Sequence, residues 1–458
     1  MRPVIIANAD ALVTMESRHV IRSGYVVLEG SQVHSIGEGA PPALPDALTV
    51  DASGCVVTPG LVNTHHHFYQ TLTRAYPPSV DATLFPWLRA LYPVWEGITA
   101  HSVRLGTALA MAELFLSGCT TTSDHHYVFP CDAEPRLIDA QIEVAKNLGM
   151  RFVATRGSMS LGTRAGGLPP DSVVQDEAVI LADCRRVVED YHDPDPFGMV
   201  QVALAPCSPF SVTPRLMEAT ATLAAELGVR LHTHLAETKD EQDYCRRHYG
   251  CTPLELLHRT GWLSPRTWLA HGIHFSDAEI RTLGDAGVGI AHCPTSNMRL
   301  ASGIARVPAL RAARCPVGLG VDGSASNDSS HLLLEMRQAL LLGRLGAGAD
   351  GFSAWDALEL ATVEGARCLG RERALGRLTP GFAADVAVFE ITDVAHSGAM
   401  DPVAGLILCA PAQVRHLFVA GRHVVCEGRI SGLDVGSLCA EHRAESLRLR
   451  RRVATHAR

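Results

Sequence analysis

Six side chains that could carry out hydrolytic chemistry occur at widely separated points of the 458-residue chain. They are His65 and His67 in PGLVNTHHHFYQ, His234 and Glu237 in LHTHLAET, His271 in WLAHGIH, and Asp322 in GLGVDGSASND. Each follows a short apolar run, which predicts a buried strand that opens into a loop. Because the carboxyl ends of parallel strands meet at one edge of a sheet or barrel, we expect these side chains to converge.

The spacing of the first pair indicates a metal site. Side chains alternate between the two faces of a strand, so His65 and His67 would point to one side and His66 to the other. The imidazole of His234 and the carboxylate of Asp322 would complete a set of nitrogen and oxygen ligands that suits zinc or ferrous iron and leaves a position for water. Binding to a divalent ion lowers the pKa of water from about 15.7 to about 7, which would make it a nucleophile.

An HxH pair by itself is weak support for a metal site, because a histidine on a strand is more often a hydrogen-bonded core residue. In this chain three more strand-end clusters follow the pair along the sequence. Their order is the one that a barrel with a single site requires. The combination favours metal ligands over core histidines.

These motifs resemble those of a known superfamily. The chain is similar to amidohydrolases, in the branch of aromatic aminohydrolases and triazine hydrolases, through PGLVNTHHHFYQ, HTHLAE, the AH of LAHGIH and GLGVDGSASND. The similarity runs from about residue 7 to about residue 428. Within this branch the chain resembles the 8-oxoguanine deaminases, a group often labelled hydroxydechloroatrazine ethylaminohydrolase, through HHHFYQTLTRA, LFPWLRALYPVW, RGSMS, GGLPPDSVVQDE, LAPCSPFSV and AHCPTSNMRLASGIA.

The predicted fold class is α/β, a (β/α)8 TIM-like barrel with a small β-sandwich built from both chain ends. Seven short apolar runs between residues 118 and 323 resemble strands, and the run that ends at His65 makes eight, the number that a closed barrel needs. Further strand patterns lie near the two ends of the chain. The expected boundaries are 1–57 and 379–435 for the sandwich, 58–378 for the barrel and 436–458 for a C-terminal helix.

Composition limits the partners and the compartment. The formal net charge of −8 disfavours nucleic acid or an anionic membrane as a partner, because both require a concentrated basic surface. No run approaches the ~18 apolar residues of a membrane span. The 13 cysteines are odd in number and contain no C-x-x-C pair, which favours a reduced, cytoplasmic protein without disulfides.

The scarcity of lysine bears on the number of metal ions. Lys146 and Lys239 are the only lysines in the chain. The resemblance implies that a two-metal site would need a carboxylated lysine at the fourth strand, near VQVALAPCSPF, which contains none. We therefore expect one divalent metal ion, with zinc favoured and ferrous iron as the alternative.

The resemblance also implies catalytic roles. Glu237 stands three residues after His234, where it can reach a metal-bound water and shuttle its proton to a ring nitrogen of the substrate. His271 would hold or polarise the attacking oxygen. Asp322, besides binding the metal, would accept a proton from the water and pass it to departing ammonia. The reaction expected is attack of the activated water on a ring carbon that bears an amine.

Substrate contacts are predicted at five positions, for each of which core packing is the alternative: Gln70, Trp87, Cys207, His125 and Arg156. The amide of Gln70 can donate and accept at once, which matches the edge of a guanine-like ring. Trp87 lies in a Pro-rich and aromatic segment, residues 68–98, that could form a lid and stack on the base. Cys207 replaces a histidine found in many relatives, and the similar deaminases also have cysteine there.

The sequence thus predicts a metal-dependent aminohydrolase, a hydrolase acting on carbon–nitrogen bonds of cyclic amidines. The substrate favoured is 8-oxoguanine, converted to urate and ammonia, with isocytosine as a smaller substrate. Hydroxyatrazine or N-alkylaminotriazine aminohydrolase and guanine or adenosyl-type deaminase are the alternatives. A non-catalytic assembly protein is a more distant one. The partners expected are the heterocycle, water and further copies of the chain in a homo-oligomer.

Overall fold

The computed structural model describes residues 2–456, and its centre is a closed barrel of parallel strands. Within these residues the barrel has eight strands, in the order β10-β11-β12-β13-β14-β15-β16-β8. Their bounds are β8 Leu61–Asn63, β10 Cys119–His126, β11 Arg151–Ser158, β12 Val200–Pro206, β13 Arg230–Leu235, β14 Thr267–His271, β15 Gly289–His292 and β16 Val317–Leu319. Nearly all their side chains are buried, as expected when helices cover a parallel sheet. The predicted fold class is confirmed.

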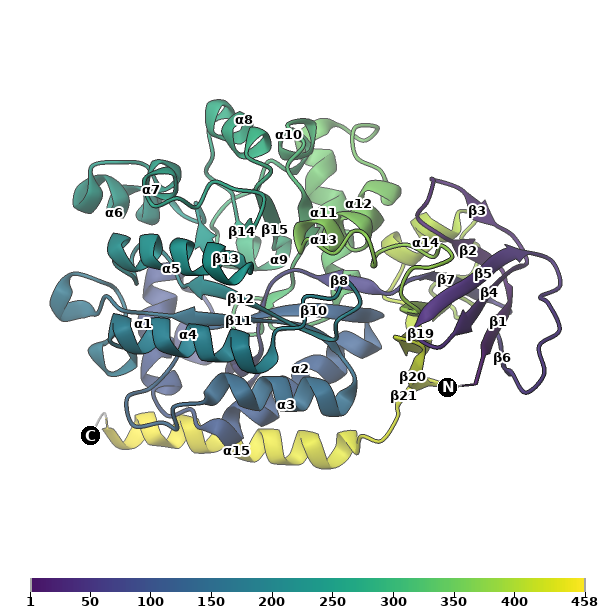
Figure 1. Cartoon of the computed structure of the whole chain (residues 1–458), viewed down its shortest axis with the longest axis horizontal. Coiled ribbons are helices and arrows are strands. Elements are labelled where there is room, and N and C mark those ends of the chain that lie inside the picture. The colour runs from purple at the N-terminus through teal and green to yellow at the C-terminus, as the bar shows by residue number, and fades with distance from the viewer. Residues whose placement is uncertain (1, 457–458) are drawn as a thin grey trace.

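Helices surround the barrel (Figure 1). They are α2 Ala100–Leu116, α3 Leu137–Leu148, α4 Glu177–Tyr191, α5 Pro214–Leu227, α6 Lys239–Tyr249, α7 Pro253–Arg259, α8 Asp277–Asp285, α9 Pro294–Arg299, α10 Val307–Ala312, α11 Leu332–Ala347, α12 Ala354–Leu360 and α13 Val363–Cys368. Local sequence sets several ends: Thr213 caps the first turn of α5, and Gly228 ends it in the left-handed conformation.

Two further sheets form the sandwich, beside the barrel at one end of the molecule (Figure 1). One sheet has the order β5-β4-β1-β6, with bounds Gln32–Glu38, Gly24–Glu29, Val4–Ala9 and Leu48–Asp51. The other has the order β21-β20-β19-β18-β7-β2-β3, with bounds Arg429–Ile430, Arg422–Cys426, Gln413–Val419, Val386–Glu390, Cys55–Pro59, Ala11–Val13 and Val20–Ile21. Strands from both chain ends therefore share one sheet. The predicted domain boundaries stay predictions.

The segment after β8 is helical rather than a long loop. It contains η1 Phe68–Thr73, η2 Pro77–Ser79 and α1 Leu84–Trp95. Pro86 falls in the first turn of α1, where a backbone N–H has no partner within the helix, so the proline is tolerated. Pro93 removes a hydrogen bond near the end of α1, which stops at Trp95. Composition alone does not predict these helices, because this effect of proline position is not visible in it.

The C-terminal helix α15, Val435–His456, runs along the outside of the barrel beneath α2 and α3 (Figure 1). It also binds the segment that follows β8. His442 Nε2 lies 3.0 Å from Thr71 Oγ1, and Ser446 Oγ donates to the Leu72 carbonyl at 2.7 Å. Helix α15 thus supports η1 from outside. A short helix, α14 Pro402–Leu408, precedes β19.

Among residues 2–456 no helix is both long and apolar enough to cross a membrane. All 13 cysteines are unpaired, and nine of them are buried, as expected of small apolar side chains. The exposed ones are Cys131 and Cys426.

Candidate active site

A break in the first barrel strand builds the site. Strand β8 ends at Asn63, and the chain resumes as β9, His66–His67, which pairs in parallel with β17, Asp322–Gly323. His65 therefore lies in the link between two strands, where its carbonyl accepts from Asp322 N at 3.1 Å. His66 points away as predicted, with Nε2 2.9 Å from Ser330 Oγ. The pairing of β9 with β17 brings the histidine and aspartate motifs together.

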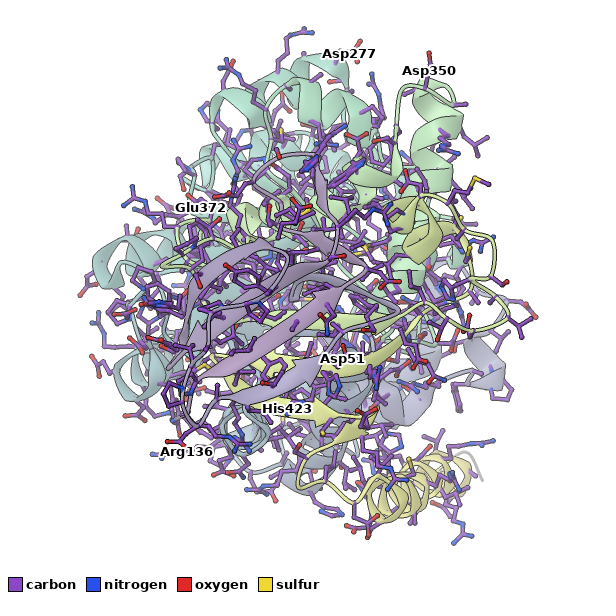
Figure 2. All side chains as sticks on the ribbon, turned by 90° about the vertical axis from the view of Figure 1, so that its right-hand side faces the viewer. Asp51, Arg136, Asp277, Asp350, Glu372 and His423 are labelled. Atoms are coloured by element: carbon purple, nitrogen blue, oxygen red, sulfur yellow. The ribbon has the colours of Figure 1, made fainter. Side chains whose placement is uncertain are left out.

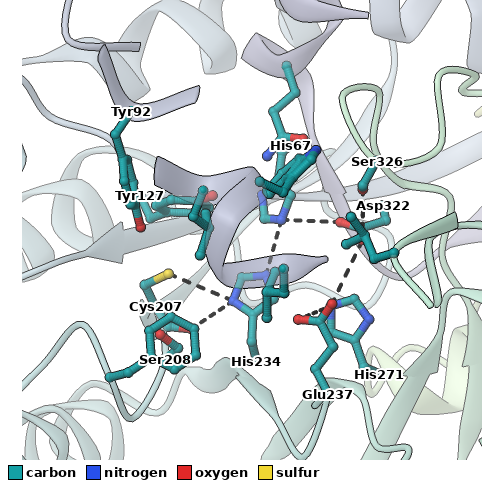
Figure 3. Close-up of a pocket in the computed structure, with 16 residues that line it drawn as sticks. His67, Tyr92, Tyr127, Cys207, Ser208, His234, Glu237, His271, Asp322 and Ser326 are labelled. Atoms are coloured by element: carbon teal, nitrogen blue, oxygen red, sulfur yellow. Dashed lines mark hydrogen bonds and ion pairs between the residues drawn. The ribbon is translucent and has the colours of Figure 1, made fainter. Parts of the chain in front are cut away.

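Four predicted ligands meet at the mouth of the barrel, and Figure 3 shows three of them, His67, His234 and Asp322. Asp322 Oδ1 lies 3.3 Å from Nε2 of His65 and 3.3 Å from Nε2 of His67. Nε2 of His67 lies 3.1 Å from Nε2 of His234. The ligand atoms of His65, His67 and His234 all lie within 4.8 Å of one another. One small cation could contact all of them.

Hydrogen bonds orient two of these imidazoles. His67 Nδ1 donates to the His125 carbonyl at 2.7 Å, and His234 Nδ1 donates to the Cys207 carbonyl at 2.7 Å. A carbonyl can only accept, so the proton of each neutral ring sits on Nδ1. The lone pair of Nε2 is then free and points into the site.

The third ligand imidazole, that of His65, is oriented by the neighbouring His232. Nδ1 of His232 donates to the Trp268 carbonyl at 2.9 Å, which leaves its Nε2 as an acceptor. That atom lies 2.8 Å from Nδ1 of His65, which must donate. Nε2 of His65 then carries a lone pair, and among residues 2–456 this buried atom has no hydrogen-bond partner. A buried acceptor without a partner, beside the Nε2 acceptors of His67 and His234, is what a metal ligand requires.

Burial keeps two of these imidazoles in the neutral form that a metal requires. It lowers the pKa of His65 well below its usual value and, together with the neighbouring His67, lowers the pKa of His234 to about 3. Three neutral imidazoles and one carboxylate are a donor set typical of zinc. The fourth barrel strand, β12, contains no lysine, in keeping with one ion rather than two.

Glu237 and His271 face the same point from the next two strands. His271 Nε2 lies 3.5 Å from Glu237 Oε2 and 3.9 Å from Asp322 Oδ2. Nδ1 of His271 donates to Asn297 Oδ1 at 2.8 Å, which fixes the ring. Burial raises the pKa of Glu237, so this carboxyl holds a proton more readily than an exposed one.

The backbone at these strand ends is strained. His271 has φ 73° and Asp322 has φ 62°, and Ala236, next to Glu237, has φ 54°. Residues other than glycine rarely adopt this left-handed region, and such residues cluster at functional sites. His271 and Asp322 thus adopt this rare conformation at the strand ends where their side chains meet.

A pocket of about 400 Å³ opens above the converging atoms (Figure 3). Its wall combines catalytic candidates with apolar and aromatic side chains: His67, Gln70, Leu84, Trp87, Leu88, Tyr92, Tyr127, Cys207, Ser208, Phe210, His234, Glu237, His271, Leu300, Asp322 and Ser326. This lining suits a flat aromatic ring with a few polar groups.

Comparison with known proteins agrees with this geometry. The model of the amidohydrolase family matches residues 56–424. The chain belongs to the amidohydrolase family.

This amidohydrolase is similar to named deaminases and aminohydrolases over most of its length. It is 54% identical to an 8-oxoguanine deaminase from Pseudomonas aeruginosa over 421 residues, which cover 92% of this chain and 93% of the relative. It is 38% identical to a hydroxydechloroatrazine ethylaminohydrolase from Pseudomonas sp., covering 84% of this chain and 81% of the relative. The predicted enzyme class, a hydrolase acting on carbon–nitrogen bonds, is confirmed.

A solved structure of atrazine chlorohydrolase from Arthrobacter aurescens TC1 in complex with zinc superposes on the amidohydrolase with a TM-score of 0.92. The two are 33% identical, and the match covers 97% of this chain and 100% of the other. An adenosine deaminase from Xanthomonas campestris with bound zinc has a TM-score of 0.89 at 27% identity, covering 98% of each chain. Together with the buried ligand set, these structures support the predicted cofactor, one divalent ion with zinc favoured.

The structure divides the five substrate-contact candidates of this amidohydrolase into two groups. Gln70, Trp87 and Cys207 line the pocket. His125 and Arg156 are absent from the lining that residues 2–456 provide. His125 Nε2 donates to the Ala205 carbonyl at 2.8 Å, and its ring stacks behind that of His234.

Arg156 acts within the protein rather than on the pocket. It lies against the ring of Phe129 and donates to Asp183 at 2.6 Å and to Gln175 at 3.0 Å. Neither side chain lines the pocket that the described residues form, so contact of His125 and Arg156 with substrate stays a prediction without support from this geometry. Both stand at strand ends, as the sequence indicates, but β10 and β11 turn these side chains toward neighbouring elements.

Sequence reasoning missed several pocket and support residues. Tyr92, Tyr127 and Phe210 belong to the wall of the pocket, and Ser326 reaches Asp322 Oδ2 at 3.3 Å. His232 was also missed, although HTH repeats the spacing of His65 and His67 and could have drawn attention to it. The aromatic residues carry no comparable signal, because aromatic side chains more often fill a core.

Proposed function

We propose that this amidohydrolase deaminates 8-oxoguanine to urate and ammonia. The 54% identity to an 8-oxoguanine deaminase over 92% of the chain supports this substrate. The observation that carries the reaction is the position of the Glu237 carboxyl, buried in the pocket beside His271 and the converging ligand atoms. A proton donor and acceptor thus faces the place where an aromatic ring would lie.

In this proposal His65, His67, His234 and Asp322 hold the metal. The ion supplies positive charge that makes water nucleophilic and stabilises negative charge on the reacting oxygen. Glu237 accepts a proton from the water and donates it to the ring nitrogen beside the amine-bearing carbon.

Two further groups complete the proton balance. His271, which Asn297 holds through Nδ1, donates a hydrogen bond from Nε2 to the attacking oxygen in its protonated form; burial opposes that form, but the Glu237 and Asp322 carboxylates favour it and raise the pKa of the ring. Asp322 passes the second proton of water to the amine, which leaves as ammonia. The new bond joins carbon to oxygen, and the bond that breaks joins carbon to the exocyclic nitrogen.

Gln70, Trp87 and Cys207 are proposed to hold the ring. Gln70 Oε1 is buried and has no hydrogen-bond partner among the described residues, so it can accept from an N–H of the substrate. Trp87 Nε1 donates to the Ala325 carbonyl at 3.0 Å, which fixes the indole at the pocket wall. The thiol of Cys207 is smaller than an imidazole and leaves room for a bicyclic ring.

The competing activities are an alkylaminotriazine aminohydrolase and a guanine or adenosyl-type deaminase. A panel of 8-oxoguanine, guanine, adenosine, isocytosine and an N-alkylaminotriazine, assayed for ammonia or amine release, separates them. We expect the highest kcat/KM for 8-oxoguanine and measurable turnover of isocytosine. A wide preference for the triazine or for guanine would reject the proposed substrate. Release of no amine from any of them by zinc-loaded protein would favour a non-catalytic assembly protein.

We further infer a cytoplasmic homo-oligomer without nucleic-acid or membrane partners. The net charge of −8 and the 13 unpaired cysteines support this assignment. Light scattering during size-exclusion chromatography should give a mass at least twice that of one 49.1 kDa chain. A monomer at micromolar concentration would contradict the oligomer.

A further inference from the structure

A cluster of two imidazoles and a thiol lies in the sandwich, apart from the barrel site. It consists of His416 on β19 with His423 and Cys426 on β20, whose ligand atoms all lie within 4.8 Å of one another. His416 is buried, and Cys426 is exposed. Figure 2 labels His423 among the yellow C-terminal strands, on the side of the molecule that the sandwich occupies. None of the catalytic candidates contributes to this cluster.

A β-bulge places the three side chains on one face. His423 and Cys426 are three residues apart, so on a regular strand they would point to opposite faces. The register of β19 with β20 shifts between Leu417 and Phe418, because Val424 is an extra residue on β20. His416 then pairs with Cys426, and His423 lies opposite Phe418, with which its ring stacks at 4.3 Å.

The distance between the two imidazoles is that of a hydrogen bond and is also compatible with a shared metal ion. His416 Nδ1 lies 3.1 Å from His423 Nε2, the same separation as between Nε2 of His67 and Nε2 of His234 in the active site. Two nitrogens bound to one tetrahedral zinc at about 2.05 Å would be about 3.3 Å apart.

The surroundings favour neutral imidazoles and a cation. Glu427 Oε1 lies 3.4 Å from His416 Nε2, which favours a proton on that atom and directs the Nδ1 lone pair at His423. The other carboxylate oxygen of Glu427 accepts from Arg415 at 3.1 Å, so that positive charge is already neutralised. Burial lowers the pKa of His416 and, with His416 nearby, lowers the pKa of His423 to about 4.

We propose that His416, His423 and Cys426 form a second transition-metal site, for which Zn²⁺ is the fitting ion. Two imidazoles and a thiolate are borderline and soft donors, which select zinc over calcium or magnesium. Exposure of Cys426 leaves the fourth position to water. The ion would join β19 to β20 near the edge of the larger sheet, where β21 alone lies beyond β20.

Cobalt substitution tests this site apart from the catalytic one. The catalytic ligands are nitrogen and oxygen atoms, so a near-ultraviolet thiolate-to-cobalt charge-transfer band would report only on a cysteine ligand. Metal-free full-length protein loaded with two equivalents of Co²⁺ should show this band. Cys426→Ser should abolish it, whereas Cys131→Ser, which alters the other exposed cysteine, should leave it unchanged.

Zinc content gives a second measurement. After equilibration with micromolar Zn²⁺ and gel filtration, the wild-type protein should retain about two zinc ions per chain, and Cys426→Ser and His423→Ala should retain about one. Deaminase activity of both variants serves as the control for folding. Absence of the cobalt band in the wild-type protein, its survival in Cys426→Ser, or equal zinc content in all forms would overturn the second site.

Discussion

At the scale of single residues, different side chains of the site are suited to metal binding and to proton transfer. His234 offers a free Nε2 because the Cys207 carbonyl holds its other nitrogen. Among residues 2–456 the Glu237 carboxyl has no such close partner. The nearest hydrogen bond to this carboxyl is a long one, 3.4 Å from Ser302 Oγ, so the carboxyl can turn between water and substrate. Substitution of His234 and substitution of Glu237 should therefore differ in their effects on metal content and turnover.

Glu237→Gln should keep the metal and lose turnover by about 100-fold to 10,000-fold, the usual contribution of a general acid–base group. The amide has the same shape but cannot shuttle a proton. His234→Ala should instead lose both metal and activity. Zinc content and ammonia release of the two purified variants, with circular dichroism as a check of folding, make the comparison. Full turnover in Glu237→Gln would remove Glu237 from the mechanism.

His232 is fully buried and is not among the described residues that line the pocket, yet it should affect metal binding through its hydrogen bond to His65. His232→Phe removes the acceptor that holds the Nδ1 proton of His65, and we expect metal affinity to fall by about 10-fold to 100-fold. His292→Phe is the matched control, since His292 is equally buried on β15 but belongs to none of the histidine clusters. Competition with a chromogenic chelator measures the metal affinity of both variants. Equal affinity of the two variants would assign His232 a packing role alone.

At the scale of elements, η1 is positioned by a close approach to α2. A Cβ at Gly106 of α2 would meet the Phe68 carbonyl oxygen at 2.9 Å and Tyr69 Cα at 3.0 Å. These atoms belong to the backbone of η1, which cannot move without shifting Gln70 in the pocket. The glycine is therefore required for the helix to pack against the segment that follows the metal ligands.

Gly106→Ala should destabilise the protein by about 1–3 kcal/mol through overpacking, although alanine is the better helix former. It should also raise KM, because η1 carries Gln70. Gly346→Ala in the exposed part of α11 is the control, since nothing lies within 4 Å of its new Cβ. That variant should be stabilised by about 0.5–1 kcal/mol. Urea denaturation and steady-state kinetics of both variants provide the measurements. A stabilised Gly106→Ala protein would contradict the packing argument.

At the scale of the whole molecule, a buried ion pair joins the barrel to the sandwich. Arg151, the first residue of β11, donates through Nε and Nη2 to Asp385 just before β18, at 2.9 and 3.1 Å. Asp385 also accepts from the backbone N–H of Ala420 at 2.7 Å. The pair thus links strands from distant parts of the chain, and both side chains are almost fully buried.

Arg151→Met should cost about 3–5 kcal/mol, because it leaves the buried carboxylate of Asp385 without its counter-charge. Arg185→Met removes an exposed partner of Glu226 and should cost less than about 1 kcal/mol. Denaturation followed by tryptophan fluorescence compares the two variants. Similar midpoints for both would show that the buried pair does not hold the two parts together.

The sequence alone determined the strands, the ligand spacing and the class of chemistry. Periodicity and the HxH, HxxE and GVDG motifs depend on neighbouring residues, so they are readable without coordinates. The expected barrel is confirmed, and the four expected ligands lie together. The sequence also excluded a bridging lysine, since that depends only on composition at one strand.

Only the tertiary structure decided which strand-end side chains face the pocket. His125 and Arg156 stand at positions like those of the ligands, but contacts with Ala205 and Asp183 turn them elsewhere. The role of His232 and the grouping of His416 with His423 likewise depend on contacts between strands. Such contacts join residues distant in sequence, and their geometry follows from bulges, strand breaks and left-handed backbone that local patterns do not encode.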